Sequence, residues 1–298
     1  MFEDPKVCIL PVAGLSTRNL PATKALHKGF LTLNSLPIIQ YAVDCCAEIG
    51  IEEIVFIYSD QSCRHLFETY FKPNEWLEKH LVEKNKLDIL EKLKAIIPSK
   101  MKFSFAAQQE PKGTGHAVLQ AKDIVGKRNF VVMYPDDVYV NLHGDGILKQ
   151  LLDVYHKTGG VVENVMKFPR EQMVRYGAFV GAKPDASNPK IIHATGLVEK
   201  PKLEDVPSEY ASMGPYILPN EILDILPSVT KGSNGEINLT DAINVAVQNG
   251  MPLTGVLCDV ERFDCGTNEE LARSNLRLSL MADKSLREYA KKVLDELD

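Results

Sequence analysis

Residues 7–18, VCILPVAGLSTR, decide the fold of this chain of 298 residues. The first six are apolar and lead into a glycine loop, as is typical of a buried strand of a parallel sheet. A helical pattern over Ile38–Ile49 then ends at Gly50, and a second apolar run follows at Ile54–Tyr58. Strand, helix and strand in this order predict a parallel βαβ unit.

Further along the chain this pattern continues and then changes. Phe130–Met133 is a third strand candidate, and Glu75–Ile97 has the apolar spacing of an amphipathic helix that is broken once. After about residue 160, strands without long helices between them favour an antiparallel extension. These strands are expected at Val161–Phe168, Ala178–Gly181 and Ile191–Glu199, and helices return over Asn238–Asn249 and Asn268–Leu297.

The sequence therefore predicts an α/β fold with a Rossmann-like, mixed but mainly parallel sheet flanked by helices. No shift in composition divides the chain, so we expect a single domain over residues 1–298. Within it, residues 1–160 form a first half, residues 161–266 a second part, and residues 267–298 a C-terminal helix.

Composition excludes several classes of protein. Hydrophobic residues make up 45% and charged residues 25%, which excludes a disordered, collagenous or coiled-coil chain. No apolar run is long enough to cross a membrane, and the acidic start argues against a signal peptide. The six cysteines form no C-x-x-C pair, so we expect free thiols and a cytoplasmic protein.

Charge is unevenly distributed along the chain. The net charge of −6 argues against binding to nucleic acid. Yet residues 5–43 contain no Asp or Glu, where an even spread of 40 acids over 298 residues would place about five. The same window holds Lys6, Arg18, Lys24 and Lys28, so it carries +4 and the rest of the chain −10. This pattern predicts a positive pocket on a negative protein.

The loop after the first strand is the candidate pocket, because ligands of open parallel sheets bind beyond the carboxyl ends of the strands. It has neither the G-x-G-x-x-G spacing of a dinucleotide site nor the G-K-[ST] of a Walker loop. Small residues followed by Arg18, Lys24 and Lys28 suit phosphate oxygens. The residues alone leave open a solvated turn with surface cations.

An ordered set of motifs identifies a resemblance that covers most of the chain. They are residues 11–25 (PVAGLSTRNLPATKA), 112–117 (KGTGHA), 134–137 (YPDD), 198–201 (VEKP), 236–243 (EINLTDAI) and 264–266 (DCG). Together they closely resemble the bacterial UTP–glucose-1-phosphate uridylyltransferases (UDP-glucose pyrophosphorylases), which are sugar-phosphate nucleotidyltransferases. The resemblance implies that the first half binds the nucleotide and that the antiparallel extension binds the sugar.

The resemblance implies the synthesis of UDP-glucose and pyrophosphate from UTP and glucose 1-phosphate. The sugar phosphate attacks the α-phosphorus in line, so catalysis is mainly positioning and charge neutralisation. Arg18 would hold the departing pyrophosphate, and Lys28 would bridge the α-phosphate and the sugar phosphate. Lys24 is either a phosphate contact or part of a structural ion pair. The resemblance further implies a homo-oligomer.

The nucleotide site is also implied by the resemblance. The backbones of Ala13 and Gly14 would contact the base, and the Gln108 amide would read the uracil edge, for which it offers both a donor and an acceptor. Gln109 is the alternative if the register slips by one residue. Gly113 and Gly115 would admit the base and the ribose.

The metal and sugar sites complete the implied set. Asp136 and Asp264 would hold Mg²⁺, an ion that prefers oxygen ligands, and Asp137 would have a structural or supporting role. The sugar would contact Gly177, Glu199 and Lys200, whereas Tyr176 is expected to pack.

Several departures from the family pattern qualify these expectations. Ser16, His27 and Gly29 stand where glycine, proline and glutamate are usual, and Pro215 stands in place of an arginine. Loss of a rigid proline before Lys28 should loosen that lysine. Alternatives are a thymidylyltransferase acting on a hexose 1-phosphate, and a weakly active or non-catalytic regulatory paralogue.

Overall fold

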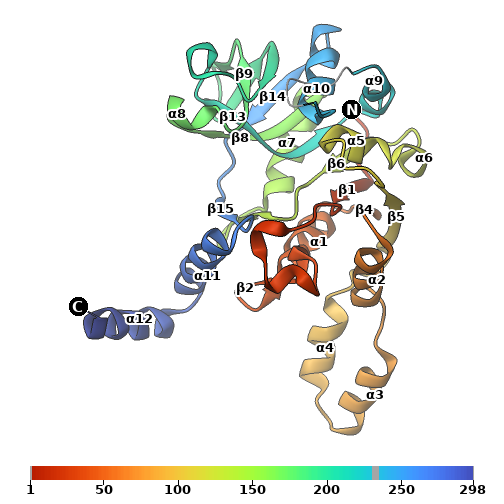
Figure 1. The fold of residues 1–298 in the computed structure, drawn as a ribbon, viewed down its shortest axis with the longest axis vertical. Coiled ribbons are helices and arrows are strands. Elements are labelled where there is room, and N and C mark those ends of the chain that lie inside the picture. Colours follow the sequence, from red (N-terminus) through yellow and green to blue (C-terminus); the bar gives the residue numbers. More distant parts are fainter. Residues whose placement is uncertain (1, 230–234, 298) are drawn as a thin grey trace.

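The computed structural model describes residues 2–229 and 235–297 (Figure 1). Its centre is an eleven-stranded sheet in the order β10-β11-β14-β8-β13-β6-β1-β4-β5, with β9 and β12 attached to β13. β1 (Val7–Pro11) lies between β4 (Glu53–Tyr58) and β6 (Phe130–Val132), and β5 (Lys102–Ala107) forms the edge. All these pairings are parallel, which confirms the predicted N-terminal half.

The second half of the sheet is mixed. β13 (Tyr210–Leu218) joins the halves, since it runs antiparallel to β6 on one side and to β8 (Val161–Lys167) on the other. β14 (Leu253–Val256) pairs parallel with β8. Four further pairings are antiparallel and extend the sheet as predicted. They involve β9 (Gly177–Val180), β10 (Lys183–Pro184), β11 (Ile191–Ala194) and β12 (Gly196–Glu199). The expected strand 191–199 is therefore two strands, because Thr195 turns back and donates its backbone N–H to the Val180 carbonyl.

Helices cover both faces of the sheet and bury two apolar clusters against it. One face carries α1 (Ile38–Glu48), α2 (Gln61–Tyr70) and α7 (Ile147–Thr158). The other carries α5 (Thr114–Leu119), α6 (Lys122–Val125), α9 (Glu221–Ile225) and α10 (Leu239–Gln248). α8 (Arg170–Met173) lies in the loop before β9. A parallel strand buried on both faces must be apolar throughout, which explains the continuous apolar runs of β1 and β4.

Two segments project from this body, as Figure 1 shows. α3 (Glu75–Glu83) and α4 (Leu87–Ala95) form a helical pair beyond α2, which is the helix predicted with one break. The C-terminal helix is also divided, into α11 (Asn268–Ala282) and α12 (Lys284–Leu297). The break falls at Asp283, whose carboxylate accepts hydrogen bonds from the backbone N–H groups of Ser285 and Leu286 and so starts a new helix.

Two small sheets lie beside the main one, and both matter for the site. β7 (Asp137–Val140) pairs antiparallel with β15 (Glu261–Asp264), and β2 (Thr32–Leu33) pairs with β3 (Leu36–Pro37). A third apolar cluster joins them to α11. All six cysteines lie in described residues and are free thiols, as predicted. Within residues 2–229 and 235–297, none of the helices has both the length and the apolar character needed to span a membrane.

Candidate active site

The loop after β1 folds into three single-turn 3₁₀ helices, at Thr17–Asn19, Ala22–Lys24 and Lys28–Phe30. Its first turn depends on Ser16, which has a left-handed backbone with φ of 54°. The Ser16 carbonyl accepts hydrogen bonds from the Asn19 backbone and the Thr23 hydroxyl. Because left-handed backbone favours glycine, the family's usual residue suits this position better than serine. The loop keeps its shape through these two hydrogen bonds.

Lys28 is anchored by the residue that replaces the family's proline. The His27 ring is buried, and its Nδ1 accepts a hydrogen bond of 3.0 Å from the Gly29 backbone N–H. It also packs edge-on against Phe67 of α2, with 5.2 Å between ring centroids. Burial, together with the nearby Lys28 charge, lowers the pKa of His27 to about 4, so the ring is neutral at pH 7. The hydrogen bond and ring packing of His27 therefore oppose the predicted loosening of Lys28.

Lys28 points at the carboxylate of Asp136, which follows β6. The Nζ–Oδ2 distance is 2.6 Å, and both side chains are largely buried. Burial alone would raise the pKa of Asp136, but Lys28 and, more weakly, Arg18 lower it below its ordinary value. The carboxylate is thus ionised and available to a cation at neutral pH.

Arg18 and Asp264 meet Asp136 around Gly266. A β-carbon on Gly266 would lie 3.0 Å from Asp264 Oδ1, 3.3 Å from Arg18 Nη2 and 3.7 Å from Asp136 Oδ2. The Gly266 backbone N–H also donates to Asp264 Oδ1 over 2.8 Å. The structure therefore brings Arg18, Lys28, Asp136 and Asp264 together from three distant parts of the chain, at a point that only glycine leaves open.

Arg262 is a site residue that the sequence reading missed. On β15 it donates to Asp137 Oδ1 through Nε over 2.8 Å and reaches Asp264 Oδ2 over 3.0 Å. Burial raises the pKa of Asp137 to about 7, an effect that Arg262 opposes and Asp136 and Asp264 reinforce. Alternate residues of a strand share a face, so the spacing from Arg262 to Asp264 was an available signal.

The donor set fits a hard divalent cation with few protein ligands. Asp136 and Asp264 offer carboxylate oxygens, which Mg²⁺ prefers, and Mg²⁺ usually keeps water and phosphate oxygens as its other ligands. Over residues 2–229 and 235–297, no group of three or more His, Cys, Asp or Glu side chains is arranged to hold a metal. Any ion here would thus depend on ligand oxygens as well as on the two aspartates.

The predicted nucleotide residues lie at the ends of β1 and β5. Gly14 is exposed, and a β-carbon there would meet no atom within 4 Å. Gln108 is buried, and its Nε2 donates to the Gly113 carbonyl over 3.1 Å and lies 3.0 Å from His116 Nδ1. This leaves the Gln108 carbonyl oxygen for a ligand. Ala13 is half-buried beside Gly14.

Gly113 and Gly115 serve packing in this structure. Gly113 has φ of 106°, and a β-carbon there would lie 2.5 Å from the Ile237 carbonyl oxygen. At Gly115 it would lie 2.9 Å from the Asn238 backbone. The KGTGHA and EINLTDAI motifs therefore form one packed unit, which the sequence reading did not connect.

A cavity of about 190 Å³ contains most of the predicted sugar residues. Glu199 at the end of β12 accepts a hydrogen bond of 2.9 Å from Thr240 of α10. A β-carbon on Gly177 would lie 3.3 Å from the same Glu199 oxygen. Lys200 lies next in the chain, with Nζ 3.7 Å from Glu199 Oε1, and is half-exposed. Tyr176 stacks on Phe168 and also lines this cavity.

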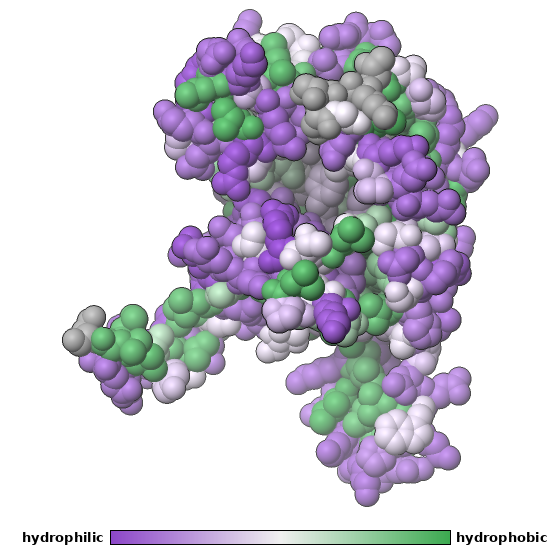
Figure 2. Space-filling model, in the orientation of Figure 1, coloured by the Kyte–Doolittle hydropathy of each residue, from purple (hydrophilic) through white to green (hydrophobic). Residues whose placement is uncertain are grey.

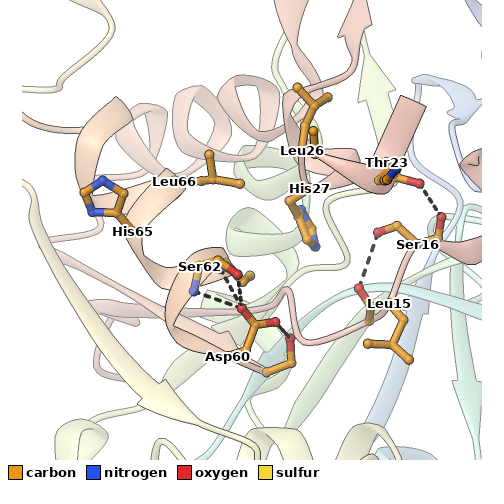
Figure 3. Close-up of a pocket in the computed structure, with 14 residues that line it drawn as sticks. Leu15, Ser16, Thr23, Leu26, His27, Asp60, Ser62, His65 and Leu66 are labelled. Carbon is orange, nitrogen blue, oxygen red and sulfur yellow. Dashed lines mark hydrogen bonds between the residues drawn. The ribbon is translucent and has the colours of Figure 1, made fainter. Parts of the chain in front are cut away.

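A second cavity, of about 320 Å³, is lined by the first loop and by the start of α2. It separates residues 14–16 and 23–27 from the start of α2, and Figure 3 shows His27 between the Ser16 side and the Asp60 side. Asp60 caps α2 by accepting backbone hydrogen bonds from Ser62 and Cys63. His27 thus lines this cavity and also holds the turn that contains Lys28.

Comparisons with known proteins show the family of this chain. The family model described as "Nucleotidyl transferase" matches residues 7–279. A UTP–glucose-1-phosphate uridylyltransferase of Komagataeibacter xylinus is 38% identical over 272 residues, which cover 90% of this chain and 91% of that protein. The Pseudomonas aeruginosa protein of the same name is 35% identical over 264 residues, with 89% and 92% covered.

A solved structure extends this similarity to the whole fold. The UTP-bound UDP-glucose pyrophosphorylase of Acinetobacter baumannii has a TM-score of 0.85 to this chain at 31% identity. The match covers 98% of this chain and 99% of that one, so both projecting segments belong to the matched fold.

Proposed function

This chain belongs to the nucleotidyl transferase family and to its UTP–glucose-1-phosphate uridylyltransferases, and we propose that it makes UDP-glucose and pyrophosphate from UTP and glucose 1-phosphate. The observation that carries this proposal is the convergence of Arg18, Lys28, Asp136 and Asp264 at Gly266. Two cations and two carboxylates at one point suit a reaction that gathers the oxygens of two phosphate groups.

The chain's own residues would act mainly by charge and position. The triphosphate would lie along the first loop, with its terminal phosphates near Arg18. Lys28 would leave Asp136 and lie between the α-phosphate and the sugar phosphate, where it reduces the repulsion between the two reacting groups. The 2.6 Å pair with Asp136 keeps the lysine aimed at the site until substrates arrive.

We assign Asp136 and Asp264 as the Mg²⁺ ligands. When bound, Mg²⁺ would offset negative charge on the α-phosphate. Arg262 would hold Asp264 in place, because it donates to the Oδ2 atom and leaves Oδ1 toward Gly266. At Asp136, Mg²⁺ would take the place of Lys28 as the cation that neutralises the carboxylate.

For the nucleotide we assign the backbones of Ala13 and Gly14 and the amide of Gln108. The geometry supports a hydrogen bond from a base N–H to the Gln108 carbonyl oxygen, because its amide nitrogen is already engaged with Gly113. Gly113 and Gly115 would shape the site through the unit that they form with residues 237 and 238. For the sugar we assign Gly177, Glu199 and Lys200, which lie together around the 190 Å³ cavity or beside it.

We also propose a homo-oligomer formed through the C-terminal arm, α11 and α12. Within the described part of α12 no residue is buried, yet Tyr289, Leu294 and Leu297 are apolar. Figure 2 shows apolar side chains on this arm where it stands away from the body. A helix with an uncovered apolar face gains free energy when a second copy covers it. The six free thiols support a cytoplasmic location.

The experiment is a pyrophosphate-release assay with glucose 1-phosphate, Mg²⁺ and each nucleoside triphosphate. Turnover with UTP far above that with dTTP is expected. Preference for dTTP would support a thymidylyltransferase instead. If folded protein binds UTP without releasing pyrophosphate, it is a non-catalytic paralogue, and the proposal is wrong.

A further inference from the structure

A buried polar cluster lies behind the sugar cavity, on two neighbouring strands. Glu163 of β8 is fully buried, and its Oε2 lies 2.5 Å from the hydroxyl of Ser212 on β13. The Ser212 hydroxyl in turn lies 3.3 Å from the hydroxyl of Tyr216. The other Glu163 oxygen, Oε1, has no hydrogen-bond partner within the described residues. A carboxyl group in this position costs stability, which calls for a functional reason.

The backbone around the cluster is shaped to bring the two hydroxyls together. β13 has a register shift between Ser212 and Tyr216, and Asn164 of β8 donates to the Gly214 carbonyl inside it. Gly214 has φ of 64°, and a β-carbon there would lie 2.5 Å from the Tyr216 ring. The ring therefore folds back over a glycine toward Ser212. This bulge also contains Pro215, which replaces the family's usual arginine.

Both hydroxyl-bearing residues line the cavity that we assign to the sugar. A β-carbon on Gly177 would lie 3.3 Å from the Ser212 β-carbon and 3.3 Å from Glu199 Oε2. Ser212 and Glu199 thus flank the same glycine. The Tyr216 ring meets Tyr134 edge-on, with centroids 6.2 Å apart. The cluster is therefore one wall of this cavity and continues its polar lining into the sheet.

We propose that Ser212 and Tyr216 contact the hexose of the sugar phosphate, and that Glu163 is a positioning residue that fixes the direction of the Ser212 hydroxyl. This inference rests on the proposed function. A protonated Glu163 donates its hydrogen to Ser212, so the serine hydrogen is free to point to Tyr216 or to a sugar hydroxyl. An ionised Glu163 accepts the serine hydrogen, and Ser212 can then only accept from the sugar.

The surroundings favour the protonated form at neutral pH. Burial raises the pKa of Glu163 to about 8, and the Ser212 hydrogen bond lowers it only in part. On β14 the residue that pairs with Glu163 is Gly255, which does not titrate. The titratable and charged side chains on the cavity side are Tyr134, Asp137, Arg175, Tyr176, Glu199 and Tyr216. Above pH 8 an ionised Glu163 would add negative charge beside a dianionic substrate and weaken its binding.

Steady-state kinetics between pH 7.0 and 9.5 tests this inference. In the wild type, the KM for glucose 1-phosphate should rise as the pH passes 8, while the KM for UTP should not follow. Glu163→Gln should keep the neutral-pH KM and lose the rise, because an amide donates to Ser212 and does not ionise. Glu163→Leu should raise this KM at every pH, and Ser212→Ala should raise it about fivefold or more at pH 7.

Glu53→Gln is the matched control. Glu53 is also a buried strand glutamate, but it pairs with Lys102 and Arg128 at the opposite side of the sheet. This variant should keep the wild-type pH profile. A pH rise that persists in Glu163→Gln, or an unchanged KM in Ser212→Ala, would overturn the inference while the wild type still makes UDP-glucose. An inactive wild type would instead overturn the proposed function, and this inference with it.

Discussion

Replacement of Arg262 should destabilise the protein more than any surface substitution. Its guanidinium is mostly buried between Asp137 and Asp264, with 16% of the side chain exposed. Arg262→Met removes the cation that pairs with both Asp137 and Asp264. Breaking a buried pair on one side costs about 3 to 5 kcal/mol.

A double-mutant cycle separates this effect from lost packing. Arg262→Met, Asp137→Asn and the double variant are compared by urea denaturation at pH 7.5. The double variant should recover about 1 kcal/mol or more relative to the sum of the two single changes, since it removes both charges of the pair. A loss below 1 kcal/mol in Arg262→Met, or strict additivity in the cycle, would refute the reasoning. Turnover should fall in Arg262→Met as well, because Asp264 loses the donor that orients it.

Three further predictions follow from single contacts. His27→Ala should lower the free energy of unfolding by about 1 to 3 kcal/mol, because the buried Gly29 N–H loses its acceptor. His27→Pro should lower it less, because proline suits the φ of −74° at this position. Thermal melts compare the two variants, and equal losses of stability would contradict the prediction. Gly113→Ala should lower the Tm, because the added β-carbon would lie 2.5 Å from the Ile237 carbonyl oxygen. Gly14→Ala should keep the Tm and raise the KM for UTP. A lower Tm in Gly14→Ala together with an unchanged Tm in Gly113→Ala would contradict the prediction. Between about pH 4.5 and 8, Glu163 is ionised in the unfolded state but still protonated in the folded state, so the free energy of unfolding of the wild type should fall as pH rises, by up to about 1.4 kcal/mol per pH unit from this group. Denaturation curves at several pH values should show this fall in the wild type and not in Glu163→Gln. The same pH dependence in both proteins would refute the prediction.

Much of the fold and of the site could be predicted because the patterns are local. The apolar runs of β1 and β4, and the acid-free window that contains Arg18 and Lys28, lie in short stretches of sequence. The position of β13 between β6 and β8 could not be read, because pairing of strands distant in sequence depends on tertiary packing.

Three residues could not be assigned a role from the sequence alone. Two of them act through partners that are far away in the sequence, and the third compensates for the loss of the family's proline. Arg262 matters because β15 pairs with β7, more than a hundred residues earlier, and places it against Asp137. At His27 the sequence indicates only the loss of a proline, yet the ring supplies the acceptor and the packing that hold the turn. No sequence pattern indicates Ser212, because its proposed role depends on a buried glutamate of the neighbouring strand.

The central claim, that Lys28 and Asp136 form the reacting centre, is tested most directly by the turnover of two variants with UTP and glucose 1-phosphate. Lys28→Ala and Asp136→Asn should each lower kcat by about tenfold or more, as expected of lost transition-state contacts. Lys6→Ala, which breaks a surface pair with Glu52, is the control and should keep the wild-type rate. Near-native kcat in both variants, from folded protein, would contradict the account.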